Sequence, residues 1–140
     1  MIDKEVIIKD FVSNFVLKER RERSYLALST PKRRASFIDR FNHKWDTVVN
    51  MHYLQKINKD FDSPTKIQQM LGFIDNDLCY VISCYDEFDD HILPFKDVFS
   101  NIYSRGFATI IINTTATIFY LETEQVQGPA NRFIGKRTNK

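Results

Sequence analysis

The sequence of 140 residues contains only four glycines, and no two of them are close enough to build a phosphate-binding loop. They stand at Gly72, Gly106, Gly128 and Gly135. The GxGxxG turn and the P-loop need several closely spaced glycines, because the backbone there must approach a phosphate group. Nucleotide binding of those two kinds is therefore excluded.

Histidine and cysteine are also scarce. None of the three histidines has a second histidine three or four residues away, and neither GxSxG nor HExxH occurs. Cys79 and Cys84 would lie about 16 Å apart if one strand ran through both, which is too far for a disulfide. We predict two free thiols, no zinc site, no cofactor and no catalytic residue, so the sequence favours a protein without enzymatic activity.

A long apolar run is missing as well. No segment approaches the ~20 apolar residues of a membrane span, and the charged start has no apolar leader segment. Together with free thiols, this predicts a cytoplasmic protein without a membrane partner. Apolar residues make up 43% of the sequence, which is ample for a core, and we expect residues 1–140 to form a single domain.

The most apolar part of the chain predicts a central hairpin. Residues 107–113 and 116–121 are β-branched and aromatic, and a short polar turn separates them. Both faces of the first run are apolar, which is typical of a strand covered on both sides. A third strand is expected over 78–84, followed by a helix over 93–105 that Gly106 closes. Strand, helix and strand in this length permit a parallel pair with a right-handed crossover.

Helices are predicted at the start of the chain. One is expected over 3–23 with Asp3 as its cap, and another over 31–44, where Pro31 follows Thr30. They would pack as a helical hairpin within 1–45. We therefore predict an α+β fold: a small three- to four-stranded mixed β-sheet, with this hairpin and one crossover helix packed on it.

The remaining segments complete this scheme. Residues 46–77 are expected to be a connector with a short helix from Ser63-Pro64 to Gly72, and with a short strand near 47–50. Residues 78–136 would form the β-α-β-β core. Its last strand, 131–135, would follow a turn at Gly128-Pro129 and would turn Arg132 toward solvent. Residues 137–140 are expected to be a frayed tail.

Positive charge is concentrated early in the chain, although the net charge is only +2. Between Lys18 and Lys44, nine Lys and Arg residues stand against three acids. A cation in the first turn of a helix is disfavoured by about 0.3–1 kcal/mol, so Lys32-Arg33-Arg34 needs compensation. Internal acids or an external anion could supply it. The candidate residues for anion or partner binding are Arg20, Arg21, Arg23, Lys32, Arg33 and Arg34.

Negative charge is concentrated in the loop 85–91, which directly follows a predicted strand. Clustered carboxylates beside a histidine could hold Mg²⁺ or Mn²⁺. A solvated loop whose acids favour the start of the next helix explains the same residues, and no Asp-x-Asp-x-Gly spacing supports a metal. The candidates for this metal hypothesis are Asp86, Glu87, Asp89, Asp90 and His91.

Opposite charges in separate segments predict interaction rather than catalysis, because such patches steer encounter and select partners. The sequence favours a protein-interaction domain of the adaptor or immunity type, whose partner is another protein or a second copy. The first alternative is nucleic-acid or phosphate binding through the basic helical hairpin. The second is a metal-dependent hydrolase that uses the acidic loop 86–91.

Overall fold

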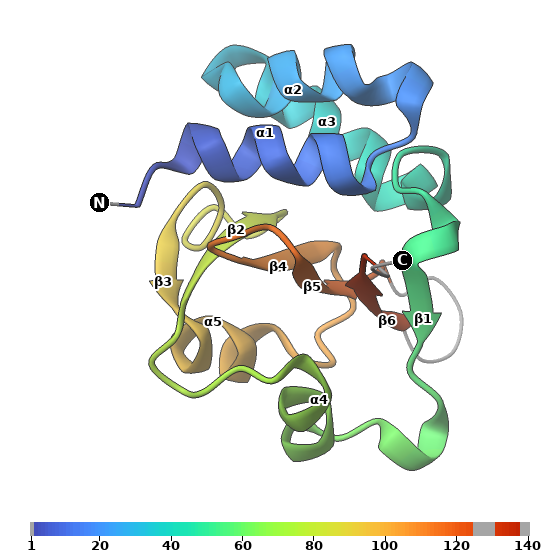
Figure 1. Ribbon diagram of the computed structural model, residues 1–140, viewed down its shortest axis with the longest axis vertical. Coiled ribbons are helices and arrows are strands. Elements are labelled where there is room, and N and C mark those ends of the chain that lie inside the picture. Colours follow the sequence, from blue (N-terminus) through green and yellow to red (C-terminus); the bar gives the residue numbers. More distant parts are fainter. Residues whose placement is uncertain (1, 125–130, 138–140) are drawn as a thin grey trace.

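The computed structural model describes residues 2–124 and 131–137, and it has three layers, with one β-sheet between two sets of helices (Figure 1). On one side lie α1 (Lys4–Phe15), α2 (Arg21–Ser29) and α3 (Pro31–Lys44). On the other side lie α4 (Pro64–Leu71) and α5 (Phe95–Ile102). The prediction of an α+β fold is confirmed.

The sheet has six strands, all antiparallel, in the order β1-β6-β5-β4-β2-β3. The strands are β1 (Leu54–Lys56), β2 (Leu78–Ser83), β3 (Ile92–Pro94), β4 (Thr109–Asn113), β5 (Ile118–Glu122) and β6 (Arg132–Lys136). The predicted hairpin, β4 with β5, stands at the centre of this order. It joins Ile111 to Tyr120 as register partners.

The two helical layers bury the two faces of the central strands. Ile110 and Ile112 of β4 belong to the apolar core under α1 and α3, whereas Ile111 belongs to the core over α4 and α5. Alternate side chains of a strand point to opposite faces, so a run that is apolar at every position fits a sheet with two cores. The predicted covering of β4 on both sides is confirmed.

The prediction of a three- to four-stranded mixed sheet is wrong. Strands β2 and β4 are antiparallel, with Val81 opposite Ile111, so no right-handed parallel crossover joins them. Residues 92–94, where the predicted helix was to begin, turn back beside β2 as β3, and α5 then returns the chain to the end of β2. Strands β1 and β3 have three residues each. Such short edge strands leave no readable alternation in a sequence.

The predicted helical hairpin consists of three helices rather than two. Helix α1 ends at Phe15, and Val16 pairs with Val49 in an isolated antiparallel bridge. The backbone N–H of Leu17 donates to Val48 O at 2.9 Å. A short 3₁₀ helix over Lys18–Arg20 then leads into α2. The helix ends here because a distant segment offers the backbone other partners, and tertiary context overrides local helix propensity.

The predictions for the connector and for the last strand are partly confirmed and partly wrong. Helix α4 follows the Ser63 cap and ends at Gly72, whose φ of 74° is the left-handed C-cap conformation. The strand expected at 47–50 is only the single bridge of Val49, and the real strand in this region is β1. Arg132 in β6 is buried rather than solvent-facing. The turn at Gly128-Pro129 and residues 138–140 lie outside the described residues.

Candidate anion-binding site

The six basic residues chosen from the sequence do not gather in one place. They were expected together because a helix over 3–23 would end beside the start of the next one. Instead α2 runs on to Ser29, so Arg20 and Arg23 lie one helix length from Arg33 and Arg34. The Nε of Arg21 donates to Val16 O at 3.1 Å. Lys32 and Arg33 are exposed, and neither forms an ion pair within the part of the chain that the structure describes.

Arg34 is neutralised inside the protein by the acidic loop. Its Nε and Nη2 donate to the two carboxylate oxygens of Asp89 at 2.7 and 2.9 Å, and its Nη1 donates to Leu28 O at 2.8 Å. Asp90 Oδ1 lies 3.5 Å from Nη1. Burial lowers the pKa of Arg34, but the hydrogen bond and the charges of the aspartates outweigh it, so the pKa is raised. The charges that are separate in the sequence therefore meet at the start of α3.

The metal candidates Asp89 and Asp90 already take part in contacts within the protein. Asp89 is held by Arg34, and Asp90 accepts from the Tyr80 hydroxyl at 2.7 Å. Asp86 is exposed, and His91 Nδ1 lies 2.7 Å from the carbonyl oxygen of Asp89. Within residues 2–124 and 131–137, no group of three or more His, Cys, Asp or Glu side chains could hold a metal ion. The described geometry therefore gives the hydrolase alternative no support.

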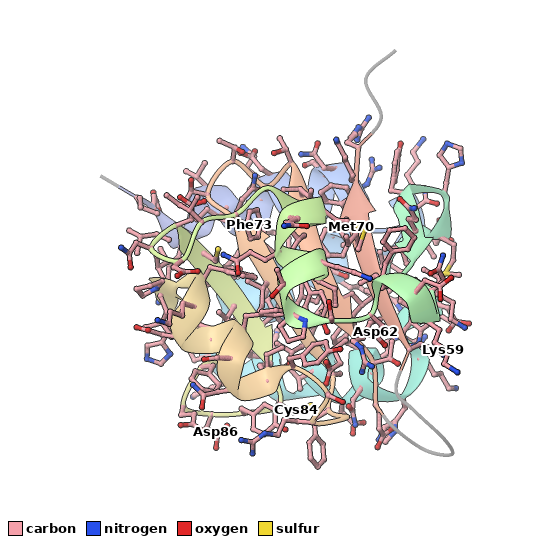
Figure 2. The ribbon with its side chains drawn as sticks, turned by 90° about the horizontal axis from the view of Figure 1, so that it is seen from below. Lys59, Asp62, Met70, Phe73, Cys84 and Asp86 are labelled. Atoms are coloured by element: carbon pink, nitrogen blue, oxygen red, sulfur yellow. The ribbon has the colours of Figure 1, made fainter. Side chains whose placement is uncertain are left out.

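A second buried ion pair lies on the opposite face of the sheet, where Asp62 precedes α4 (Figure 2). Arg132 Nε donates to Asp62 Oδ1 at 2.8 Å, and Nη2 donates to Oδ2. The hydrogen bond from Arg132 lowers the pKa of Asp62 below its ordinary value, against the opposing effect of burial, and the Tyr103 hydroxyl adds a further hydrogen bond. Buried Glu122 lies 4.0 Å from Arg132 Nη1 and accepts from the backbone N–H of Gly106. This network joins β6 to the segments before α4 and after α5.

Three other arginine side chains line a cavity of about 270 Å³ between α2 and α3. The 3₁₀ helix and α2 contribute Arg20, Arg23, Ser24 and Ala27. These residues are spaced three and four positions apart, so they share one helical face. Phe37, three residues before Arg40 in α3, contributes a buried apolar floor together with Val48. The lining residues are Arg20, Arg23, Ser24, Ala27, Ser36, Phe37, Arg40 and Val48.

The charge in this cavity has one sign. Among the residues that the structure describes, the lining includes no Asp, Glu, His or Cys. In the described residues, Arg20, Arg23 and Arg40 form no ion pair, and Arg40 Nε is buried without a hydrogen-bond partner. A buried polar donor without a partner is costly, typically by about 1–3 kcal/mol. Arg20 and Arg23 also stand at the first turn of α2, where the helix dipole disfavours cations. An anion in the cavity would relieve the unfavourable interaction of these arginines with the helix dipole.

The side chains of the cavity are suited to binding an anion. Ser36 Oγ donates to Arg33 O at 2.7 Å, and the described lining residues include no carboxylate or imidazole beside it. Outside the cavity, burial raises the pKa of the Cys79 thiol to about 12, so this thiol stays protonated near neutral pH. Guanidinium groups, by contrast, are suited to recognising carboxylate and phosphate.

Sequence reasoning missed Arg40 as a member of this site. Arg20 and Arg40 stand equally far before and after Thr30, the corner between α2 and α3. In two antiparallel helices, residues equally distant from the corner lie side by side, so this symmetry could have paired them. It was hidden because the helix before the corner was expected to end at Arg23, whereas α2 runs on to Ser29.

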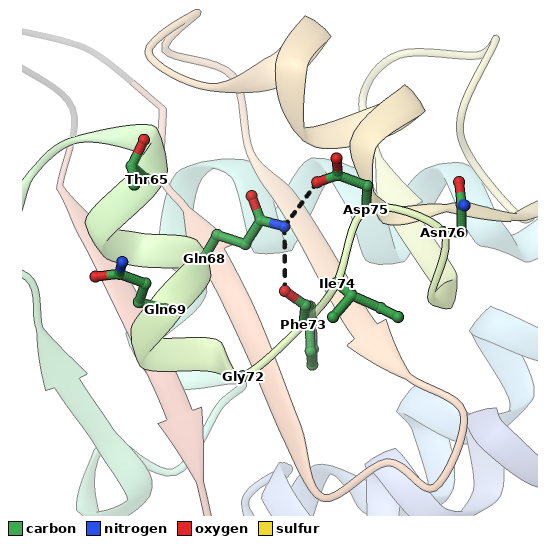
Figure 3. Close-up of a pocket in the computed structure, with 8 residues that line it drawn as sticks. All are labelled: Thr65, Gln68, Gln69, Gly72, Phe73, Ile74, Asp75 and Asn76. Atoms are coloured by element: carbon green, nitrogen blue, oxygen red, sulfur yellow. Dashed lines mark hydrogen bonds between the residues drawn. The ribbon is translucent and has the colours of Figure 1, made fainter.

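A larger surface depression lies beside α4, and two of its polar side chains, Gln68 and Asp75, are hydrogen-bonded to each other. It has a volume of about 640 Å³ and is open to solvent, and Figure 3 shows its lining from Thr65 to Asn76. Gln68 Nε2 donates to Phe73 O at 3.1 Å and to Asp75 Oδ1 at 2.9 Å. The exposed Ile74 gives it an apolar edge. No converging charge selects a ligand here, so the arginine cavity is the better candidate site.

Comparisons of the chain with protein-family models, curated proteins and solved structures found no match to any of them. Within the residues that the structure describes, no helix has the length and apolar character needed to cross a membrane. The function is therefore inferred from the geometry and charge of the chain itself.

Proposed function

We propose that this protein is a non-enzymatic interaction domain that binds an acidic segment of a partner protein through the arginine cavity between α2 and α3. The observation that carries the proposal is the contrast in pairing. Arg34 is neutralised by Asp89, whereas none of the three cavity arginines forms an ion pair among the described residues. Charge of one sign over an apolar floor is the complement of an acidic side chain presented by a partner.

A protein partner fits this surface better than a nucleic acid does. Nucleic-acid binding draws its affinity from many phosphate contacts along an extended basic surface. Here Glu19, Glu22 and Asp39 interrupt the basic residues, and all three are exposed. The cavity is compact and apolar at its base, which suits one anchoring side chain rather than a continuous backbone of phosphates. The two free cysteines support a reducing, cytoplasmic location.

The test compares two variants that lose the same charge. Fluorescence anisotropy would follow a labelled peptide rich in Asp and Glu, first with the wild type and then with each double substitution. Arg23→Gln with Arg40→Gln should weaken binding about tenfold, because charge-assisted hydrogen bonds between the cavity and the ligand are lost. Lys32→Gln with Arg33→Gln should change the affinity less than about twofold, because these exposed cations act only through a screened field.

Two results would contradict the proposal. Equal losses in both double variants would show that the peptide follows net charge rather than the cavity. Binding of single-stranded RNA or duplex DNA without peptide binding, with a steep dependence on salt, would favour the nucleic-acid alternative. Light scattering on the same samples separates a second copy from a foreign partner, because self-association would raise the mass without added peptide.

A further inference from the structure

We infer that the anchoring group of the partner is a phosphorylated side chain rather than a carboxylate. This inference rests on the proposed function and narrows it to one ligand chemistry. It starts from the number of donors, because three guanidinium groups and two serine residues surround a single cavity of about 270 Å³. Each guanidinium presents several N–H groups in a planar fork.

A carboxylate would leave this donor set largely unused. It carries one negative charge on two oxygens, and a single arginine can satisfy it in a two-bond contact, as Asp89 and Arg34 already demonstrate in this protein. A phosphomonoester carries about 1.5–2 negative charges near pH 7 and offers three acceptor oxygens. It can therefore face Arg20, Arg23 and Arg40 together and leave less positive charge unbalanced.

The position of the cavity adds to this preference. Arg23 and Ser24 lie in the first turn of α2, a helix of nine residues, whose positive dipole end favours a multiply charged anion over a singly charged one. Ser24 is buried at the cavity wall, and Arg40 Nε is a buried donor without a partner among the described residues. The start of α2 and the three arginines lie at the same cavity and support the same ligand.

The pH dependence of binding distinguishes the two ligands. The second pKa of a phosphomonoester is about 6, whereas a glutamate carboxyl titrates near 4.3. The charged groups facing the cavity are Arg20, Arg23 and Arg40, which stay protonated throughout this range. His43 follows Arg40 by three residues, but its ring contacts Glu124 and Asp39 instead of lining the cavity. A change in affinity between about pH 5.5 and 7.5 would therefore report on the ligand.

The experiment uses peptides of one acidic sequence that differ at one position: phosphoserine, glutamate or serine. At about pH 7.5 the phosphoserine peptide should bind about tenfold tighter than the glutamate peptide, and this advantage should shrink toward about pH 5.5. The glutamate peptide should change less than about twofold over the same range. Inorganic phosphate should compete with the phosphopeptide, and acetate should compete much less.

Matched substitutions then locate the phosphate. Arg40→Lys keeps the charge but removes the planar fork, and it should reduce the phosphoserine preference about fivefold or more. Arg33→Lys is the control outside the cavity and should leave the preference unchanged. Arg23→Lys, at an exposed position, repeats the test if Arg40→Lys lowers the melting temperature.

The outcomes separate this inference from the proposed function. Equal affinity for the phosphoserine and glutamate peptides, without pH dependence, would overturn the phosphate assignment and leave acidic-segment binding intact. A phosphoserine preference that survives Arg40→Lys and Arg23→Lys would also overturn it, because the phosphate would then bind elsewhere. If neither peptide binds, both the inference and the proposed function are wrong.

Discussion

Arg34 and Arg132 lie in buried ion pairs, whereas Arg20, Arg23 and Arg40 surround a cavity without one in the described residues. Each buried arginine holds both oxygens of one aspartate, and each is only 7% exposed at its side chain. Both join segments that are distant in the sequence: α3 to the acidic loop, and β6 to the residues before α4. Their charge is therefore used by the fold, whereas we propose that the cavity arginines bind a ligand.

The basic and acidic residues that are separate in the sequence are not separate in the fold. The acidic loop 85–91 lies against the start of α3, where Asp89 and Asp90 meet Arg34. The excess of basic residues between Lys18 and Lys44 therefore includes one charge that is internal. The cavity arginines, which form no ion pair among the described residues, are the part of this excess that we propose for a partner.

The largest effect is expected when one member of a buried pair is removed. Asp89→Ala should lower the free energy of unfolding by about 2–4 kcal/mol, because buried Arg34 would lose both hydrogen bonds to Asp89 and keep only the longer ion-pair contact with Asp90 at 3.5 Å. The backbone N–H of Ser83 would also lose the Asp89 oxygen that accepts from it at 2.9 Å. Urea denaturation measures the change. Asp86→Ala, an exposed position in the same loop, should change stability by less than about 0.5 kcal/mol.

A double substitution sharpens this prediction. If the loss comes from an unbalanced buried charge, Arg34→Met together with Asp89→Leu should recover much of the stability that Asp89→Ala loses. A double variant that is as unstable as the single one would show that the pair fixes the loop by its hydrogen bonds rather than by charge balance. A single variant no less stable than Asp86→Ala would remove the distinction between the two sets of arginines.

A smaller effect, with a clear pH signature, is expected at the second pair. The pKa of Asp62 is lowered in the folded protein, so the folded state binds this proton more weakly than the unfolded state does. Its stabilising contribution is therefore present above the ordinary pKa of 3.8 and is lost as the pH falls through the lower folded value. Asp62→Asn should lower stability by about 1.5–3 kcal/mol at neutral pH and flatten the acid limb of the stability curve.

The control for this prediction is Asp60→Asn. Asp60 is exposed, and its side chain forms no ion pair among the described residues. Asp60→Asn should leave the free energy of unfolding at neutral pH, and its decrease toward acid pH, close to those of the wild type. Unfolding curves measured at several pH values below neutrality make the comparison. If Asp62→Asn keeps the full acid dependence, another carboxyl group carries it.

The features that could be predicted from the sequence are those written in adjacent residues. Helix α4 was placed by the Ser63-Pro64 start and by Gly72, because caps act within one turn. The central hairpin was placed by its two apolar runs and the short polar turn between them. These signals need no knowledge of distant partners.

The features that were missed depend on contacts between distant segments. The end of α1 follows from the bridge between Val16 and Val49, and the burial of Arg132 follows from Asp62. Neither pair has a local signature. The candidate site was half predicted, because Arg20 and Arg23 were chosen whereas Arg40 became a member only through the actual corner at Thr30. A site between two helices can be no better predicted than the pairing of the helices.

The smallest effect has the opposite sign to the first two and concerns the cavity. Arg23 stands at the positive end of α2 near two other arginines, so Arg23→Gln should raise the free energy of unfolding by about 0.3–1 kcal/mol. Lys44 stands in the last turn of α3, where the dipole favours a cation, so Lys44→Gln should lower it by a similar amount. Thermal unfolding at low salt measures both changes.

This difference in sign is what a binding residue predicts, because an arginine kept for a ligand carries a cost to the free protein. Inorganic phosphate should reverse the order of stability of the wild type and Arg23→Gln. An anion that binds only the folded state raises the melting temperature, and the wild type should gain more than Arg23→Gln. If Arg23→Gln lowers stability in the absence of phosphate, Arg23 has a partner within the fold. The cavity arginines would then belong with Arg34 and Arg132, and the case for a ligand would lose its basis.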